Sequence, residues 1–164
     1  MAFVEALAAS VRERGRYYEE FEPGAVFEHH WGRTLTESDN LHLTLSTVHY
    51  NPLYFNAETA RSEGHPATPL NPYLIFCTVL GLTVEDLSEM GGAFLGIEDM
   101  KFLRPVYPGA TLTARSTVVG RRPSSKNPGF GIATWLTEGF IDNGQVKVLE
   151  YRRSNMVLMR GGDA

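Results

Sequence analysis

The sequence of 164 residues has little cysteine, no excess of positive charge and no long apolar run. Its single cysteine, Cys77, excludes a disulfide framework and a cysteine-based zinc site. Because Cys77 lies in an apolar stretch, we expect it to be an inert core residue. The net charge of −4 argues against a nucleic-acid partner, and no segment approaches the roughly 18 apolar residues of a membrane span. The N-terminus also lacks the basic segment of a signal peptide, so we expect a cytoplasmic protein without a membrane partner.

The chain divides by pattern into a lead-in, one domain and a short tail. Apolar residues recur at i, i+3, i+4 and i+7 between Val4 and Val11, which predicts an amphipathic helix within residues 1–20. Residues 21–160 hold enough apolar content for one core, and we expect them to form a single domain. The Gly-Gly-Asp-Ala end, residues 161–164, predicts a disordered tail.

One helix is expected near the middle of the sequence. Asn71 is a plausible N-cap and Pro72 suits the first turn. From Tyr73 to Val84 nearly every residue is apolar or small, which predicts a helix buried on all sides.

The rest of the chain is strand-like. Asp142-Asn143-Gly144 indicates a hairpin. His29 and His30 should lie on opposite faces of one strand, so they cannot share a metal ion, and we expect no metal site. The expected strands cover residues 25–34, 93–103, 110–120, 130–141 and 145–159. An antiparallel sheet of about five strands wrapped around the apolar helix would bury that helix, and this predicts an α+β fold of the hot-dog type.

The segment of residues 46–60, STVHYNPLYFNAETA, is the strongest candidate for an active site. Asn51-Pro52 predicts a turn, because proline fixes its own φ and restricts the residue before it. A turn held in this way can direct His49, Asn51 and Tyr54 toward one small volume. A turn without chemistry, a satisfied histidine and a packing tyrosine are the alternatives.

These residues resemble the MaoC-like (R)-specific enoyl-CoA hydratases, a hot-dog family whose signature loop reads approximately G-D-x-N-P-x-H. Residues 48–54, VHYNPLY, match that frame, and residues 56–60 continue it. The helix start at residues 36–39 and the strand and turn at residues 102–109 match as well. The resemblance covers roughly residues 20 to 158, and it is closest to the branch that includes mesaconyl-CoA-type hydratases.

Both catalytic positions of that family are substituted here. His49 stands at the position of the catalytic aspartate and Tyr54 at that of the catalytic histidine. The resemblance implies that His49 replaces the base, since an imidazole titrates near neutrality. It also implies that Tyr54 binds the water or delivers a proton, and that Asn51 orients either group.

The family's His-Gly at the mouth of the central helix is Asn71-Pro72 in this chain. A backbone N–H from that region holds the thioester oxygen in related enzymes, and Pro72 has none to donate. We therefore expect the side-chain amide of Asn71 or the N–H of Tyr73 to serve as the oxyanion donor.

The resemblance implies an acyl-CoA hydratase/dehydratase, a hydro-lyase acting on α,β-unsaturated CoA thioesters. Branched and dicarboxylic acyl groups of the mesaconyl and itaconyl type are the candidate substrates, with coenzyme A as part of the substrate and no other cofactor. One alternative is a catalytically impaired hot-dog protein that binds acyl-CoA or supports a partner subunit. A thioesterase is disfavoured, because Asn71 to Val84 contains no carboxylate.

The densest basic patch of the sequence is the predicted loop of residues 121–129. It is a candidate site for the phosphates of coenzyme A, although a solvated loop without ligand is the alternative. Arg104 is a second candidate for a phosphate or a carboxylate. We expect a homodimer or higher homo-oligomer, because a single hot-dog unit leaves sheet edges uncovered, and in such an assembly the partner can supply the basic loop. The proposed phosphate ligands in the loop are Arg121, Arg122, Ser124, Ser125 and Lys126.

Overall fold

The computed structural model describes residues 14–162, so the helix expected between Val4 and Val11 lies outside the described residues. The helical elements are η1 (Tyr18–Glu20), α2 (Glu37–Ser46), η2 (Pro52–Tyr54), α3 (Ala57–Ser62) and α4 (Pro72–Leu87). The strands are β1 (Val26–Glu28), β2 (Arg33–Thr34), β3 (Phe94–Phe102), β4 (Thr111–Pro123), β5 (Phe130–Ile141) and β6 (Val146–Leu158).

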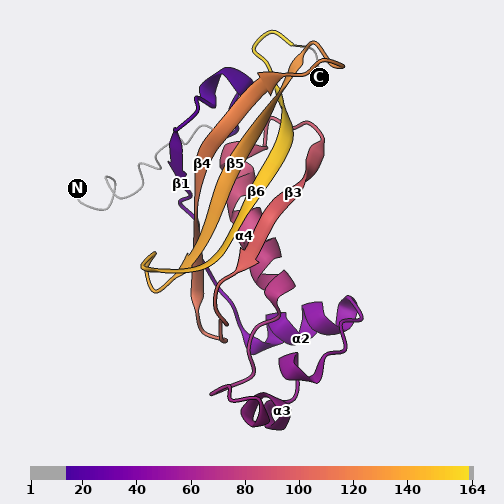
Figure 1. Cartoon of the computed structure of the whole chain (residues 1–164), viewed down its shortest axis with the longest axis vertical. Coiled ribbons are helices and arrows are strands. Elements are labelled where there is room, and N and C mark those ends of the chain that lie inside the picture. Colours follow the sequence, from indigo (N-terminus) through magenta and orange to yellow (C-terminus); the bar gives the residue numbers. More distant parts are fainter. Residues whose placement is uncertain (1–13, 163–164) are drawn as a thin grey trace, which may run out of the picture.

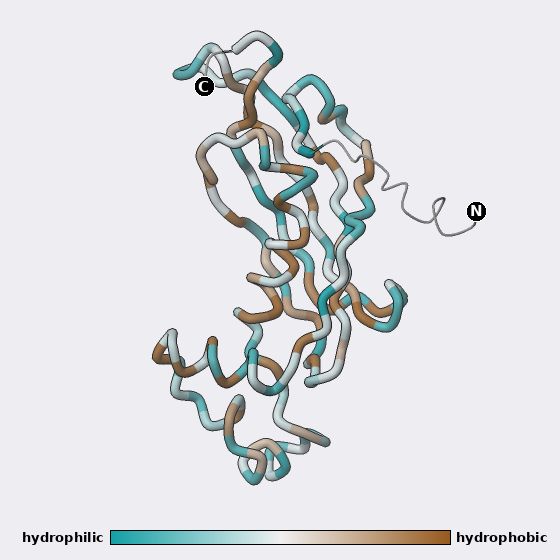
Figure 2. Tube along the Cα trace, turned by 180° about the vertical axis from the view of Figure 1, so that it is seen from behind, coloured by the Kyte–Doolittle hydropathy of each residue, from teal (hydrophilic) through white to brown (hydrophobic). Residues whose placement is uncertain are grey.

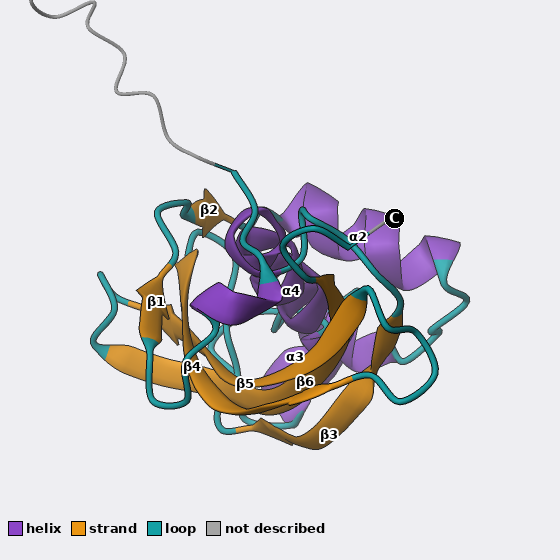
Figure 3. Ribbon diagram, turned by 90° about the horizontal axis from the view of Figure 1, so that it is seen from above, coloured by secondary structure: helices purple, strands orange, loops and turns teal. Residues whose placement is uncertain are grey.

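The described residues form one antiparallel sheet in the order β1-β4-β5-β6-β3, with β2 also paired to β4. The sheet curves around α4, and α2 and α3 gather at one end of it (Figures 1 and 3). Hydrophobic and hydrophilic segments alternate along the strands (Figure 2), as expected when one face of a sheet covers the core. The four C-terminal strands and the α+β class are as the sequence predicts.

The early strand expected over residues 25–34 is wrong in one respect, because it is two short strands. Glu28 pairs with Arg115 and Arg33 pairs with Leu112. The early segment therefore advances five residues while β4 advances three. The two extra residues interrupt the ladder, and the sheet has six strands rather than about five.

The helix α4 is also less buried than its apolar composition predicts. Its inner face packs Leu74, Ile75 and Val79 into the main core. On its outer side Tyr73 is 55% exposed and Val84 is 39% exposed. Cys77 is exposed as well, so its expected place in the core is wrong. The sheet covers one side of the helix, and the described residues cover these outer positions only in part.

A row of buried, hydrogen-bonded polar side chains connects the C-terminal half of α4 to the sheet. His29 lies 2.7 Å from Asp86 of α4 through Nδ1 and 2.9 Å from Ser116 of β4 through Nε2. Ser116 lies 2.9 Å from Thr137 of β5. Because all four side chains are buried and hydrogen-bonded, these hydrogen bonds fix the position of α4 on the sheet.

Candidate functional site

The helix α2 begins with the capping box that the sequence predicts. The N–H of Asp39 donates to Thr36 Oγ1 at 3.2 Å, and the N–H of Thr36 donates to Asp39 Oδ2 at 2.9 Å. Hydrogen bonds from the backbone and hydroxyl of Thr36, with the nearby charge of Arg33, lower the pKa of Asp39. The capped helix directs Asn40 and Thr44 inward, where both are fully buried.

Asn40 holds together the two segments that form the site. Its amide donates to the carbonyl of Tyr54 at 2.8 Å and to the carbonyl of Pro69 at 3.2 Å. Its Oδ1 accepts the N–H of Asn71 at 2.7 Å. One buried side chain thus fixes the backbone of the active-site turn relative to the mouth of α4. The sequence gives no signal for this role, because the partners lie 14 to 31 positions away.

The turn of residues 47–56 is built much as its sequence indicates. Asn51 caps η2, and its Oδ1 accepts the N–H of Leu53 at 3.1 Å. Asn51 is exposed, and this capping bond is the contact its side chain makes within the described residues. Val48 has a φ of 57°, an unfavourable conformation for a β-branched residue. Such strain is often found at functional sites.

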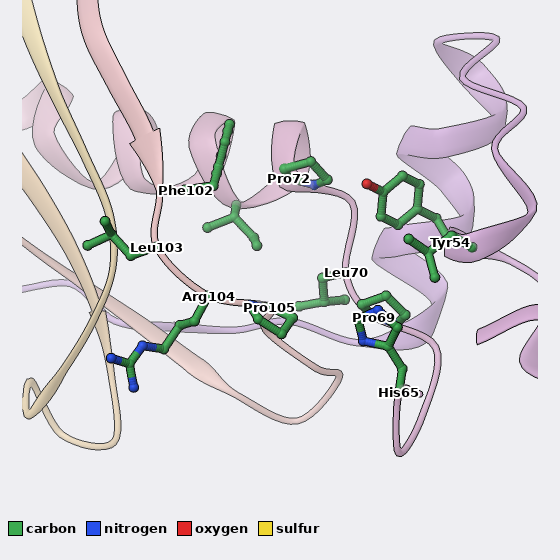
Figure 4. Close-up of a pocket in the computed structure, with 11 residues that line it drawn as sticks. Tyr54, His65, Pro69, Leu70, Pro72, Phe102, Leu103, Arg104 and Pro105 are labelled. Atoms are coloured by element: carbon green, nitrogen blue, oxygen red, sulfur yellow. The ribbon is translucent and has the colours of Figure 1, made fainter. Parts of the chain in front are cut away.

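His49 and Tyr54 are brought together by this turn. Their ring centroids are 5.4 Å apart, and the ring of Tyr73 lies 5.5 Å from that of His49. Burial, with smaller contributions from Tyr73 and Glu63, raises the pKa of Tyr54. The Tyr54 hydroxyl has no hydrogen bond to any described residue and points toward Pro72 (Figure 4). The phenol is therefore a protonated group that is free to bind a ligand.

The mouth of α4 leaves no free N–H for an oxyanion. Pro72 has no N–H, and the N–H of Tyr73 donates to Asn71 Oδ1 at 3.0 Å. The N–H groups of Leu74 and Ile75 both donate to the carbonyl of Asn71. The amide nitrogen of Asn71 donates to Thr44 Oγ1 at 3.1 Å and faces His49 Nδ1 at 2.9 Å. Both donors expected for the thioester oxygen, the Asn71 amide and the Tyr73 N–H, are already engaged.

A cavity of about 270 Å³ opens beside this mouth (Figure 4). Its wall is mostly apolar, and none of the described residues that line it is an aspartate or glutamate. Arg104 lies at its rim, and its guanidinium extends away from Tyr54 (Figure 4). Arg104 has no ion pair with a described residue. The lining residues include Tyr54, Leu70, Pro72, Ile75, Phe102 and Arg104.

His65 is a lining residue that the sequence reasoning missed. Its Nδ1 lies 3.0 Å from the hydroxyl of Tyr107. The Gly64-His65-Pro66 break marks a turn in the sequence, but the pairing with Tyr107 bridges 42 positions and carries no local signal. His65 thus adds an imidazole, held by Tyr107, to the lining of the cavity.

The basic patch lies far from this cavity within one chain. Arg121 to Pro123 are part of β4 rather than of a loop. The patch follows the end of β4 that lies away from α2 and α3 (Figure 1), and a strand of this length spans roughly 40 Å. Arg121 is engaged by the carbonyls of Tyr18 and Glu19 and by the carboxylate of Glu22, so it is not a free phosphate ligand.

The loop beyond β4 keeps two cations available. Arg122 and Lys126 form no ion pair with a described residue. Ser124 Oγ accepts the N–H of Asn127 at 3.1 Å, while Ser125 makes no side-chain hydrogen bond within residues 14–162. These four residues remain candidates for a phosphate site, at a distance from His49 and Tyr54 of the same chain.

The described part of the chain offers no metal centre and no membrane span. Within residues 14–162 no three His, Cys, Asp or Glu side chains are grouped so that they could hold a metal ion. No helix of this part is both long and apolar enough to cross a bilayer.

Comparison with known proteins places these features in context. A family model described as mesaconyl-CoA hydratase matches residues 1–163. The mesaconyl-CoA hydratase of Haloarcula hispanica is 39% identical over 152 residues, which are 93% of this chain and 42% of that protein. The β-methylmalyl-CoA dehydratase of Chloroflexus aurantiacus is 34% identical over 153 residues, which are 92% of this chain and 42% of that protein.

Solved structures show the same architecture. The crystal structure of a MaoC domain protein dehydratase from Chloroflexus aurantiacus has a TM-score of 0.86 and 32% identity, and the match covers 96% of this chain and 44% of that one. A Mycobacterium tuberculosis protein described as a double hot-dog fold has a TM-score of 0.73 and 25% identity, over 88% of this chain and 44% of that one. The architecture is thus the hot-dog fold, and the chain spans about 42% of the length of the curated relatives it matches.

Proposed function

Because this chain belongs to the mesaconyl-CoA hydratase family, we propose that it adds water to, or removes it from, an α,β-unsaturated CoA thioester. The substrate class is a branched or dicarboxylic acyl group, since the relatives are named for mesaconyl-CoA and β-methylmalyl-CoA. Coenzyme A enters as part of the substrate. The observation that carries the proposal is the family match over residues 1–163 together with a free, protonated phenol facing an apolar cavity.

The cavity suits a short acyl chain. Its volume of about 270 Å³ is several times the roughly 30 Å³ that one water molecule occupies in the liquid. Apolar lining favours the carbon skeleton, and Arg104 at the rim is a cation without an ion pair to any described residue. A rotamer change of Arg104 would bring this cation to the second carboxylate of a dicarboxylic acyl group.

Hydration needs a base for water, an acid for the α-carbon and a donor for the thioester oxygen. Tyr54 can bind the water or protonate the carbon, because burial raises its pKa and keeps it protonated. Asn51 contributes by shaping the turn through its cap on η2. None of the described residues lining the cavity is a carboxylate, and the lining imidazole, His65, is paired through Nδ1 with the hydroxyl of Tyr107. We therefore propose that a second subunit completes the catalytic set.

The second subunit is most simply another copy of this chain. β3 pairs with β6 on one side and has no described strand on the other. Phe94, Leu95 and Phe102 along it are exposed. Uncovered edge strands with apolar side chains favour pairing with another chain. In such an assembly Arg122, Ser124, Ser125 and Lys126 of the partner would bind the phosphates of coenzyme A. An exposed, unpaired Cys77 fits the reducing cytoplasm.

The alternative function is that of a supporting subunit. It is favoured by the engagement of both expected oxyanion donors, the Asn71 amide and the N–H of Tyr73. Such a protein would bind acyl-CoA, or stabilise a catalytic partner, without turning the substrate over by itself.

The test is the loss of enoyl-thioester absorbance when the purified chain is mixed with mesaconyl-, itaconyl- or crotonyl-CoA. Mesaconyl-CoA should lose absorbance fastest, and light scattering should give twice the 18.2 kDa mass of one chain. Binding without turnover, measured by calorimetry, would favour the supporting subunit. Absence of both binding and turnover would refute the proposal.

A further inference from the structure

The amide of Asn71 has one possible orientation. Its Oδ1 lies 3.0 Å from the N–H of Tyr73, which can only donate. Turning the amide over would place two donors against each other and remove the N-cap of α4. The network therefore assigns Nδ2 of Asn71 to the opposite side, where Thr44 and His49 lie.

The two hydrogens of that nitrogen have separate acceptors. One is directed to Thr44 Oγ1 at 3.1 Å and the other to His49 Nδ1 at 2.9 Å. An amide nitrogen donates and does not accept, so Nδ1 of His49 must supply a lone pair. Neutral imidazole carries one proton, and with Nδ1 as acceptor that proton lies on Nε2.

We infer that Asn71 sets the tautomer of His49, so that the neutral ring offers an Nε2–H donor to an oxygen of the bound thioester and serves as a base through neither nitrogen. Nδ1 is occupied by the amide, and Nε2 already carries the proton. The role expected from the sequence, in which His49 activates water, is thereby reversed. The tautomer follows from the hydrogen bonds alone, and the thioester as ligand rests on the function proposed above.

The two free donors, Nε2–H of His49 and the hydroxyl of Tyr54, favour an oxygen as the ligand atom. The N–H groups at the mouth of α4 are engaged, and so is the Asn71 amide. His49 is half-buried, and its Nε2 has no hydrogen bond to a described residue. Its ring lies 5.4 Å from that of Tyr54, whose hydroxyl is also free. Two neighbouring donors can share one acceptor with two lone pairs, and a neutral imidazole can polarise a carbonyl in this way.

Asn71 is thus a positioning residue with an electronic effect. A carboxylate in its place would accept from Nδ1–H instead of donating to Nδ1. Asn71→Asp keeps the size and the cap on the N–H of Tyr73, yet it should move the proton of neutral His49 from Nε2 to Nδ1. A purely structural role for Asn71 predicts no such exchange.

The tautomer is measurable by nitrogen NMR in the protein without ligand. At about pH 8.5, where an ordinary imidazole is neutral, long-range ¹H–¹⁵N spectra should show His49 with an unprotonated Nδ1 and a protonated Nε2. The signals are assigned by their loss in His49→Gln. A protonated Nδ1, or a mixture of both tautomers, would overturn the inference whether or not the chain is a hydratase.

The variant pair tests the part played by Asn71. Asn71→Asp should reverse the two nitrogen signatures, whereas Asn56→Asp should leave them unchanged. Asn56 is the matched control, because it caps α3 through the N–H groups of Glu58 and Thr59, and the side-chain hydrogen bond that His49 makes within the described residues is to Asn71. An unchanged His49 in Asn71→Asp would refute the assignment. If that variant does not fold, the wild-type spectrum decides the tautomer by itself.

The ligand is tested with butyryl-CoA, a saturated thioester that cannot be hydrated. Its binding should move the Nε2 proton signal of His49 downfield, and His49→Ala should weaken binding roughly three- to tenfold, the loss of one neutral hydrogen bond. Binding that leaves the His49 signals in place would refute the donor role while leaving the proposed function intact. Absence of binding, with the tautomer as inferred, would count against the proposed function instead.

Discussion

At the scale of single residues, Asn40 shows how much of the site depends on one buried amide. Its side-chain amide bonds the backbone, rather than the side chains, of Tyr54, Pro69 and Asn71. Asn40→Ala would remove the side-chain partner of one N–H and two carbonyls, of which only the carbonyl of Tyr54 is half-buried rather than buried. We expect the free energy of unfolding in urea to fall by about 2–4 kcal/mol.

The control for that change is Asn51→Ala. Asn51 is an exposed amide with one backbone hydrogen bond, to the N–H of Leu53. Its removal should lower the free energy of unfolding by no more than about 1 kcal/mol, the usual effect of a lost cap. Equal losses for the two variants would contradict the connecting role of Asn40.

Tyr54 supplies the second prediction at this scale. Tyr54→Phe should reduce turnover by about a hundredfold, the typical contribution of a positioned acid. The melting temperature should stay the same, since the hydroxyl has no hydrogen bond to a described residue. Because burial raises the pKa of Tyr54 above its ordinary value near 10, the wild-type rate should show no loss from ionisation of Tyr54 up to that pH.

Tyr50→Phe is the matched control for Tyr54. Tyr50 lies on the same turn with 63% of its surface exposed and should tolerate the change without effect on rate. A rate of Tyr54→Phe equal to that of the wild type would remove the phenol from the mechanism.

At the scale of secondary structure, the capping box at the start of α2 makes a measurable contribution to the free energy of unfolding. Thr36→Ala removes the hydroxyl that accepts the N–H of Asp39 and should lower the free energy of unfolding by about 1 kcal/mol. Ser38→Ala, in the same turn and exposed, is the control and should have little effect.

The stability that the capping box at the start of α2 contributes depends on pH in a defined direction. Hydrogen bonds from Thr36 lower the pKa of Asp39, so its stabilisation is complete above the ordinary carboxyl value and is lost as the pH falls through the lowered one. The difference between wild type and Thr36→Ala in urea should therefore shrink between pH 7 and about pH 3. A constant difference would mean that the bond from the Thr36 hydroxyl to the Asp39 carboxylate does not depend on the charge of Asp39, since the backbone bond is kept in both proteins.

Local signals predicted the elements well and their surroundings less well. The capping box, the Asn71 cap, the hairpin at Asp142-Asn143-Gly144 and the four long strands all follow from neighbouring residues. The predictions that were wrong concern which side of an element is covered by the rest of the protein. Apolar composition could not show that the outer side of α4, with Cys77, is covered only in part, because burial depends on how far the sheet curves.

The candidate site was likewise predictable in part. The turn predicted that His49 and Tyr54 lie close together, and their rings are 5.4 Å apart. The direction of the hydrogen bonds around them was not predictable, because it depends on Thr44 and Asn71, which come from two other segments. Residue types indicate which groups a site contains, while contacts distant in sequence decide which of these groups donate hydrogen bonds and which accept them.

At the scale of the whole molecule, Tyr151 links the core to alkaline stability. It is fully buried on β6, and its hydroxyl has no hydrogen-bond partner within residues 14–162. Burial raises the pKa of Tyr151. Its contribution is therefore present below the ordinary value near 10 and is lost as the pH rises through the raised one.

Tyr151→Phe tests this link. At pH 7 the variant should be as stable as the wild type or slightly more so, because an unpaired buried hydroxyl is removed. Between about pH 9 and pH 11 the wild type should lose more of its free energy of unfolding than the variant does. Equal losses would assign the alkaline sensitivity to other groups.

The length of β4 separates the basic loop of a chain from its own cavity by nearly the whole sheet, and this has a genetic consequence if each site borrows the loop of its neighbour. A protein defective in its loop, Arg122→Ala with Lys126→Ala, and a protein defective in its turn, His49→Ala, should each be poor enzymes alone. When the two are produced together, half of the randomly formed dimers are hybrids, and each hybrid rebuilds one intact site, so about a quarter of the wild-type activity should return. Mixed lysates of separately folded dimers should regain it only as fast as subunits exchange. If no activity returns on co-production, both halves of the site belong to one chain.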